Sequence, residues 1–307
     1  MFSSIWQDIR REFSYGNMMT RVIIVNVIVF LVVNAIMIVS FLFNGGYIPD
    51  FFYQMLHFFS LGKSWEHNLY HPWVILTHMF LHQGFFHLLW NMLYLYWFGH
   101  IVGDLIGNHR IVPVYLLGGL AGALVFFLSA NYFPSVGEYA LGASAAVMAV
   151  AMAAGVMAPD YILRLVIFGE IKLKYIVAVL LLLDLIGVAT TTNSGGHLAH
   201  IGGAMMGYIY ARLLRSGTDL AAPINRIIDF ISSPGSLFRF GSRKAKRPGP
   251  RLVYRNKATI GRPSGRTDTS ENTDNQAKLD QILDKIRLSG YDSLNQEEKE
   301  FLLKMSR

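Results

Sequence analysis

The 307-residue chain contains no cysteine, which excludes disulfide bonds and thiolate metal sites from its structure and its chemistry. Charge is scarce as well, because only 15% of the residues are Asp, Glu, Lys or Arg, against roughly a quarter in soluble domains. Hydrophobic residues make up 53% of the chain and lie in long runs. This composition is typical of a polytopic membrane protein.

Six apolar segments approach the length needed to cross a hydrocarbon core, which is roughly 20 residues of helix for about 30 Å. We therefore predict an all-α polytopic membrane protein with six transmembrane helices and a long first outer loop. The predicted spans are residues 21–43, 77–98, 111–130, 139–157, 174–190 and 196–214. A shorter apolar piece, residues 161–168, is predicted to be re-entrant or interfacial.

Positive charges beside these segments predict their orientation. The residues before the first span and after the second, fourth and sixth are Arg10, Arg11, Arg21, Arg110, Arg164, Lys172, Lys174, Arg212 and Arg215. The opposite side has Lys63 alone in residues 44–76 and no Lys or Arg in its other two loops. Since cytoplasmic loops carry an excess of Lys and Arg, we expect both termini in the cytoplasm. We expect the membrane to be a bacterial plasma (inner) membrane.

Two segments outside the spans each allow two interpretations. In residues 1–20, which show no cleavable signal peptide, apolar side chains recur at helical spacing. That pattern predicts either a helix in the membrane interface or a solvated helix. The first outer loop, residues 44–76, is rich in aromatic side chains. It is expected either to lie partly in the outer leaflet or to pack as a compact loop on the bundle.

Polar residues recur at one depth in three of the predicted spans. Ser144 and His200 lie about five residues, and His87 about ten, from the outer ends of their spans, which corresponds to depths of roughly 7 to 15 Å. Asn91 lies four residues after His87, on the same helical face. Ionisable residues are costly inside a bilayer, so their presence there indicates a functional site. We therefore predict one buried site formed by these four residues.

Small residues indicate how two of these spans approach each other. The two stripes are Gly203, Gly207 and Ala211 in the sixth span, and Gly142, Ala145, Ala149 and Ala153 in the fourth. Such stripes let transmembrane helices pack closely. Close packing of these two helices would bring Ser144 within reach of His200.

Other chemistries fit the sequence less well. Five histidines, His78, His82, His87, His197 and His200, suggest a metal site, but the chain has no His-Glu-x-x-His motif, so we predict no metal and no cofactor. An aspartyl mechanism needs two carboxylates in one site, and Asp184 is the only acidic residue well inside a span. We expect Asp184 to bond within the bundle. A transporter would predict an internal repeat or broken helices with charged midplane residues, and the sequence shows neither pattern.

Residues 73–212 resemble the rhomboid family of intramembrane serine proteases. The resemblance is carried by three motifs: His82-Gln83-Gly84-Phe85-Phe86-His87-Leu88-Leu89-Trp90-Asn91-Met92, Gly142-Ala143-Ser144-Ala145 and Ala199-His200-Ile201-Gly202-Gly203. They are similar to the family's second-span signature, its Gly-x-Ser-Gly nucleophile motif and its Ala-His-x-x-Gly motif. The order of the spans and the long first loop fit as well. Ala145 departs from the family, because it replaces the glycine that usually follows the nucleophile.

A serine hydroxyl is weakly nucleophilic until a base takes its proton, so we assign Ser144 as nucleophile and His200 as base. We expect no carboxylate to orient His200, which makes the pair a Ser-His dyad. The resemblance implies that His87, the Asn91 amide and the Ser144 N–H stabilise the oxyanion. It also implies that transmembrane helices of other proteins are the substrates, cut near the outer face. The alternative is an inactive rhomboid-like protein that binds membrane-protein clients.

The composition changes after residue 215. Residues 239–266 contain ten Lys or Arg and no acidic residue, which predicts a disordered linker attracted to anionic lipid headgroups rather than to nucleic acid. Helical spacing then returns, with a break at Ser289-Gly290 and a capping box predicted from Ser293 to Gln296. This small hairpin is either a regulatory docking element or an amphipathic lid. The predicted divisions are residues 1–20, 21–215, 216–275 and 276–307.

Overall fold

The computed structural model describes residues 7, 17–165, 169–190, 193–232 and 270–305. It divides the chain into two compact units, Met1–Gly241 and Ser242–Arg307. The predicted N-terminal helix and the basic linker at residues 239–266 lie outside the described residues.

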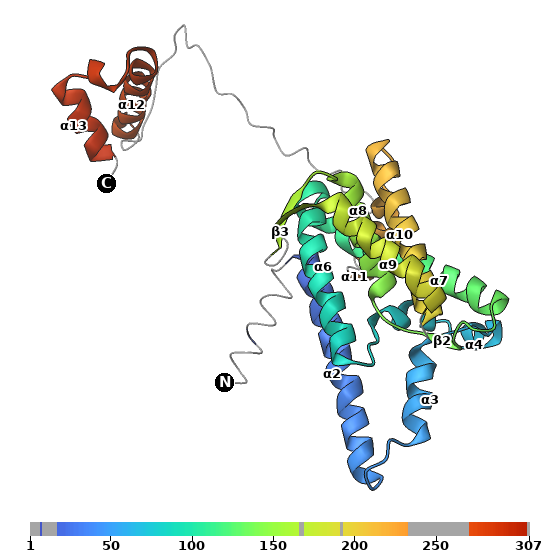
Figure 1. Cartoon of the computed structure of the whole chain (residues 1–307). Helices are drawn as coiled ribbons and strands as arrows, with labels where there is room; N and C mark the ends of the chain where they lie inside the picture. Colours follow the sequence, from blue (N-terminus) through green and yellow to red (C-terminus); the bar gives the residue numbers. More distant parts are fainter. Residues whose placement is uncertain (1–6, 8–16, 166–168, 191–192, 233–269, 306–307) are drawn as a thin grey trace, which may run out of the picture. The chain divides into compact units, whose positions relative to one another are not determined.

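The first unit is a helical bundle whose six long helices fall on the six predicted apolar segments (Figure 1). They are α2 (Met18–Phe43), α6 (Phe85–Ile106), α7 (Ile111–Tyr132), α8 (Ser144–Met157), α9 (Leu173–Thr190) and α10 (Ser194–Arg215). Among the described residues, two helical stretches are long and apolar enough to cross a membrane, α2 and the segment Asn108–Tyr132 that contains α7. The order of the helices along the chain is the predicted one.

The second and fourth helices begin later than predicted. Residues before α6 form two short helices, α5 (Val74–Thr77) and η1 (His78–Phe80), and Gly84 is extended with φ −122° and ψ 150°. The helix therefore starts at Phe85 instead of residue 77. Before α8, Gly142 has φ 125°, a conformation that an α-helix cannot contain. The predicted start at residue 139 is therefore wrong, and α8 starts at Ser144.

The first loop is folded and contacts the segment before α8. It contains α3 (Asp50–Phe59), β1 (Leu61–Gly62) and α4 (Trp65–Tyr70). The strand β1 pairs antiparallel with β2 (Tyr139–Ala140), with Leu61 opposite Ala140. The indole N–H of Trp73 donates to the carbonyl of Phe58 at 2.8 Å, and their rings lie 4.7 Å apart. The loop is thus packed through its own aromatic residues, while other rings, including those of Phe51 and Trp65, stay exposed.

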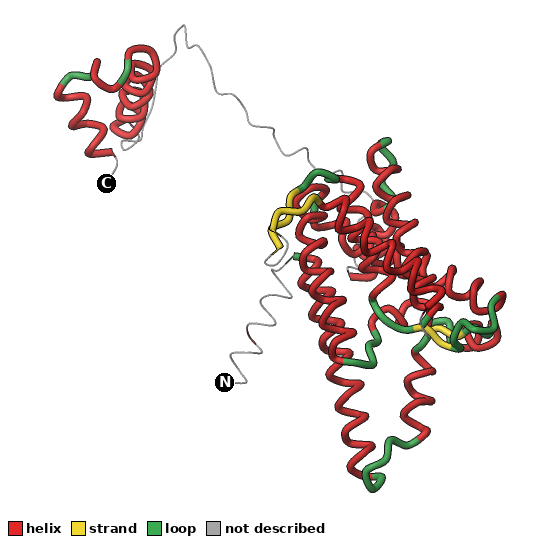
Figure 2. Tube along the Cα trace, in the orientation of Figure 1, coloured by secondary structure: helices red, strands yellow, loops and turns green. Residues whose placement is uncertain are grey.

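The piece at residues 161–168, predicted to be re-entrant or interfacial, contributes a strand in its described part. The strands β3 (Ile162–Leu165) and β4 (Gly169–Lys172) pair antiparallel, and both strand pairs are visible in Figure 2. Arg164 and Glu170 face each other in this pairing and form an ion pair at 2.9 Å. Cross-strand pairs of opposite charge stabilise a sheet. In β4, the apolar Ile171 lies between the polar Glu170 and Lys172, an alternation that is typical of a strand.

The core of the bundle is built on glycines that let backbones touch. A Cβ on Gly203 would lie 2.0 Å from the carbonyl oxygen of Ala145, and a Cβ on Gly207 would lie 2.2 Å from that of Ala149. The helix α7 approaches the same face of α8, since a Cβ on Gly122 would lie 2.4 Å from the Cβ of Ala145. The contact between α8 and α10 thus runs along the two stripes of small residues.

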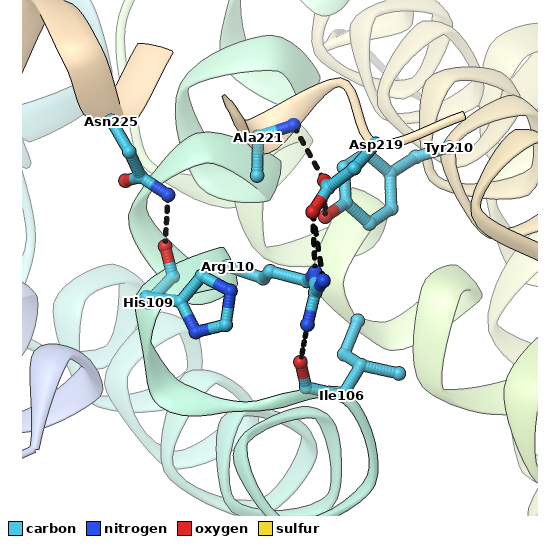
Figure 3. A network of polar contacts seen from close by, with 7 residues as sticks. All are labelled: Ile106, His109, Arg110, Tyr210, Asp219, Ala221 and Asn225. Carbon is cyan, nitrogen blue, oxygen red and sulfur yellow. Dashed lines mark hydrogen bonds and ion pairs between the residues drawn. The ribbon is translucent and has the colours of Figure 1, made fainter. Parts of the chain in front are cut away.

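The far end of α10 is held by a polar network (Figure 3). The Arg110 guanidinium donates to Asp219 Oδ2 from Nε at 3.0 Å and from Nη2 at 2.8 Å, and it also donates to the carbonyl of Ile106. The other carboxylate oxygen accepts from the N–H of Ala221 at 2.9 Å and from the Tyr210 hydroxyl at 3.4 Å. The turn between α6 and α7 is therefore joined to α10 and to the start of the next helix, α11 (Ala221–Ser232).

This network also sets the ionisation of Asp219. Partial burial pushes the pKa of this carboxyl upward, but the bonds from Arg110 and from the Ala221 N–H outweigh burial. The pKa of Asp219 therefore lies below its ordinary value, and the carboxylate is the form that the fold stabilises.

The second unit is a helical hairpin of α12 (Ser270–Ser289) and α13 (Gln296–Met305), with η4 (Tyr291–Ser293) between them. The break falls at Gly290, which has φ 80°. The predicted capping box from Ser293 to Gln296 is wrong: Asn295 and Glu298 form it, and each side chain accepts from the other's N–H at 2.9 Å. The cap lies two residues later because residues 291–293 form the connecting turn.

Candidate functional site

Ser144 is the first residue of α8, so it does not lie inside an apolar span as predicted. The segment before it is fixed by two contacts. The N–H of Gly142 donates to the carbonyl of His78 at 2.8 Å, and the N–H of Ala143 donates to His82 Nε2 at 3.4 Å. The first N–H groups of a helix have no partner within the helix, and they carry its partial positive charge. The Ser144 hydroxyl is thus placed beside free backbone donors.

His87 and Asn91 come from the first half of α6. The ring of His87 lies against the backbone of Gly142, where a Cβ would be 2.8 Å from His87 Cε1 and 3.7 Å from Ser144 Oγ. Gly142 is therefore required both by its positive φ and by this close approach. The Asn91 amide donates one hydrogen to the carbonyl of His87 at 2.8 Å, which leaves its second hydrogen for another acceptor.

His200 lies on α10, one turn before the glycine that touches Ala145. Its Nδ1 is 2.7 Å from Asp184 Oδ1, and Nδ1 of His197 is 2.8 Å from the same oxygen. The expectation that no carboxylate orients His200 is therefore wrong. It failed because Asp184 comes from α9, and the rotation of that helix about its own axis is set by its packing on α10 rather than by the local sequence.

These side chains line one cavity of about 770 Å³. The polar residues in its wall include Ser144, His200, His87, Asn91 and Asp184. The rest is largely apolar and includes residues of α6 and α9. His87 and His200 are close enough for their charges to interact. Ser144 and His200 both belong to the described part of the chain, and no hydrogen bond joins them there. Hydrogen bonds between a nucleophile and its base are often long before a substrate binds.

The first loop contributes a residue that the sequence analysis missed. His57 of α3 lines the same cavity, and its ring stacks on Tyr139 with centroids 4.0 Å apart. Burial, and then the nearby charge of His67, lower the pKa of His57, which favours the neutral imidazole. The pairing of β1 with β2 brings this loop to the site, and a strand of two residues carries too little pattern to be predicted.

Asp184, His197 and His200 are also the one group of three potential metal ligands in the part of the chain that the structure describes. Their ligand atoms all lie within 4.8 Å of one another. The nitrogen-to-oxygen distances of 2.7 and 2.8 Å are those of hydrogen bonds. Ligands of a tetrahedral zinc ion, each about 2.0 to 2.1 Å from the metal, would be about 3.3 Å apart.

Two family models match the chain. The rhomboid domain matches residues 70–217, and a family of unknown function (DUF6576) matches residues 269–307. The first match contains Ser144, His200, His87 and Asn91. The second match covers α12 and α13.

Several curated proteins are similar over the same region. Presenilin-associated rhomboid-like protein A, mitochondrial, from Danio rerio is 30% identical over 43% of this chain and 34% of its own length. The Rattus norvegicus presenilin-associated rhomboid-like protein, mitochondrial, is 28% identical over 53% and 43%. Rhomboid protein 1, mitochondrial, from Saccharomyces cerevisiae is 31% identical over 44% and 40%.

The matched segments therefore span less than half the length of these relatives. All three relatives are mitochondrial by name, so they give no support to a bacterial plasma membrane. The predicted resemblance over residues 73–212 is confirmed, with limits only a few residues wider. Residues 70–217, which hold Ser144 and His200, match the rhomboid domain.

Proposed function

We propose that this protein is an intramembrane serine endopeptidase that cuts transmembrane segments of other membrane proteins near the outer membrane face. One observation carries the proposal: Ser144 and His200 line one cavity and lie at the contact of two helices whose backbones touch. The six long helices would all cross the membrane, with both termini in the cytoplasm. The basic linker would bind anionic lipid headgroups.

The reaction would begin when His200 takes the hydroxyl proton of Ser144 as Oγ attacks the scissile carbonyl carbon. The tetrahedral intermediate would collapse with His200 donating that proton to the leaving amine, which gives an acyl-enzyme. Water, deprotonated by the same imidazole, would then hydrolyse the ester and restore Ser144.

The negative oxygen of the intermediate would be stabilised by the Ser144 N–H, the free hydrogen of the Asn91 amide and His87. The position of Ser144 at the start of α8 supports this, because helix N-termini attract negative charge. A single donor of this kind contributes about 3 to 4 kcal/mol to the transition state.

The cavity wall supports a helical, apolar substrate. Besides its polar residues it contains Trp90 and Tyr94 of α6 and Leu180 and Leu183 of α9. A helix keeps its backbone groups paired internally, so the scissile bond must leave the helical conformation before Ser144 can attack. We therefore expect a preference for substrates with helix-weakening residues near the cut.

The second candidate function is an inactive protein that binds membrane-protein clients, and Ala145 is the observation that favours it. The extra methyl next to Ser144 meets a glycine, however: Gly122 of α7 faces the Ala145 Cβ at a distance that allows no side chain. The methyl of Ala145 thus fills space left by Gly122 and does not displace Ser144. This complementary pair supports retained activity.

The deciding experiment is labelling of the membrane-embedded protein with a fluorophosphonate probe. We expect wild-type protein to react and Ser144→Ala and His200→Ala to be silent. Ser129→Ala is the matched control, because Ser129 is another buried serine of the bundle and should leave labelling unchanged. Labelling that survives in Ser144→Ala would refute the nucleophile. Absence of labelling in every form would favour the client-binding protein.

A further inference from the structure

The helix α9 buries one acidic side chain while the apolar side chains next to it stay largely exposed. Asp184 is 7% exposed, whereas the adjacent Leu182, Leu183, Leu185 and Ile186 are each at least 50% exposed. A carboxyl group in such an apolar helix is costly unless it is bonded. The buried carboxyl group of Asp184 therefore needs hydrogen-bond partners that offset the cost of its burial, and these partners lie on α10.

The two partners of Asp184 differ in what else they face. His200 and His197 both place Nδ1 at hydrogen-bond distance from Asp184 Oδ1. His200 lines the cavity beside Ser144, but His197 is not among the residues that line it. Instead, the His197 ring packs on Gly187 of α9, where a Cβ would lie 2.5 Å from it. One carboxylate thus holds one histidine inside the site and one outside it.

A carboxylate at Nδ1 decides which nitrogen of His200 is free. Since the carboxylate only accepts, Nδ1 must carry the hydrogen, and Nε2 of the neutral ring keeps its lone pair. That lone pair is what a base needs to take the Ser144 proton. The carboxylate also stabilises the imidazolium that forms when the proton arrives.

We propose that Asp184 is a positioning residue that fixes the tautomer and orientation of His200, which makes the site a three-residue relay of Ser144, His200 and Asp184. This inference rests on the proposed protease function and adds a member to its dyad. His197 bonds the same carboxylate oxygen and is not among the residues that line the cavity. The distances at Asp184 favour hydrogen bonding over a shared metal ion.

The test is the rate of fluorophosphonate labelling as a function of pH, measured on the full chain in lipid vesicles. We expect Asp184→Asn to label about 100-fold more slowly or worse, because its amide can donate to Nδ1 and favour the wrong tautomer. Asp184→Glu should recover part of the rate. His197→Gln is the matched control, since it removes a partner of the same oxygen outside the cavity, and it should stay within about threefold of wild type.

The pH profile separates positioning from a merely structural role. The titratable groups nearest His200 are Asp184 on α9, His197 on its own helix and His87 on α6. Removing the negative charge of Asp184 should move the midpoint of the labelling profile to lower pH, because the imidazolium loses its counter-charge. Loss of a helix contact alone would lower the amount of reactive protein at every pH and leave the midpoint in place.

Three results would overturn the inference. The first is labelling of Asp184→Asn within threefold of wild type with an unchanged midpoint. The second is a reduced amount of reactive protein in both Asp184→Asn and Asp184→Glu with the midpoint of the wild type. The third is an equal loss in His197→Gln together with a change of the wild-type rate on adding EDTA, which would indicate a metal site. Wild-type labelling that depends on Ser144 would leave the protease function standing in all three cases, whereas an unreactive wild type would remove both.

Discussion

The helix α10 is held on two sides by opposite means. Towards α8 it presents bare backbone, with Gly203 and Gly207 against the carbonyl groups of Ala145 and Ala149. Towards α9 it presents imidazole rings that share the carboxylate of Asp184. Contact between backbones fixes a distance but no orientation, whereas hydrogen bonds fix the orientation of a ring and tolerate small shifts. The nucleophile and the base thus depend on one kind of contact for their separation and on another for their alignment.

The largest effect should come from adding one methyl group to the α8 side. In Gly203→Ala the new Cβ would meet a carbonyl oxygen at 2.0 Å, so the two helices must separate. Overpacking usually costs 1 to 3 kcal/mol, and we expect about 3 kcal/mol here because backbone cannot move aside as a side chain can. Thermal unfolding measures the loss of stability, and fluorophosphonate labelling measures the loss of the reactive site.

The matched control for that change is Gly137→Ala. Gly137 has no atom within 4 Å of its would-be Cβ, so the substitution should alter neither stability nor labelling. If Gly203→Ala proved as stable and as reactive as Gly137→Ala, the account of the α8–α10 contact would be wrong.

The same methyl group on the α9 side should have a smaller effect. In Gly187→Ala the new Cβ would meet the His197 ring, which is a side chain that can rotate away. We expect a loss of about 1 kcal/mol and only a few-fold reduction in labelling, measured as for Gly203→Ala. A loss equal to that of Gly203→Ala would mean that α9 is as rigidly seated as α8.

The smallest effect should come from the third contact of α10, the network of Arg110 and Asp219. We expect Asp219→Asn to cost about 0.5 kcal/mol at neutral pH, since both side chains are partly exposed. Because the folded state lowers the pKa of Asp219, its contribution is present above the ordinary carboxyl pKa and is lost as the pH falls through the lowered one.

Unfolding of wild type and of Asp219→Asn at several pH values measures this contribution. Their difference in unfolding free energy should be largest near neutral pH and should vanish in acid. A difference that grew in acid would contradict the assigned sign. Labelling should not change, because Asp219 contacts the end of α10 that lies away from His200.

Sequence reasoning predicted the features that depend on local pattern. The order of the six helices and the stripe containing Gly203 could be read from spacing and composition, and the resemblance around Ser144 from its motif. The starts of α6 and α8 could not be predicted, and Gly142 leaves the helical conformation beside a contact with a distant part of the chain. Gly142 is held by the carbonyl of His78, and β2 by a strand about 80 residues earlier.

Asp184 shows the same limit within the site. Its sequence neighbourhood predicts a buried acidic residue that must find a partner, but it does not say which helix supplies that partner. Only the seating of α9 against α10 brings Oδ1 to His200. The predicted capping box from Ser293 to Gln296 failed for a local reason instead, because a turn of 3-10 helix occupies the residues where the cap was expected.

The length of α8 would determine how deep in the membrane the proposed protease cuts its substrates. Its 14 residues rise about 21 Å, which is roughly 9 Å less than the hydrocarbon core. In the proposed orientation, Lys172 and Lys174, which pair with Asp160 beyond the far end of α8, would lie at the inner boundary, and Ser144 would then lie below the outer one. A substrate helix standing in the same bilayer has about six residues above that level. The proposed enzyme would therefore cut each substrate helix at a fixed number of residues from the membrane surface. Substrates of unrelated sequence would then yield products of matching length.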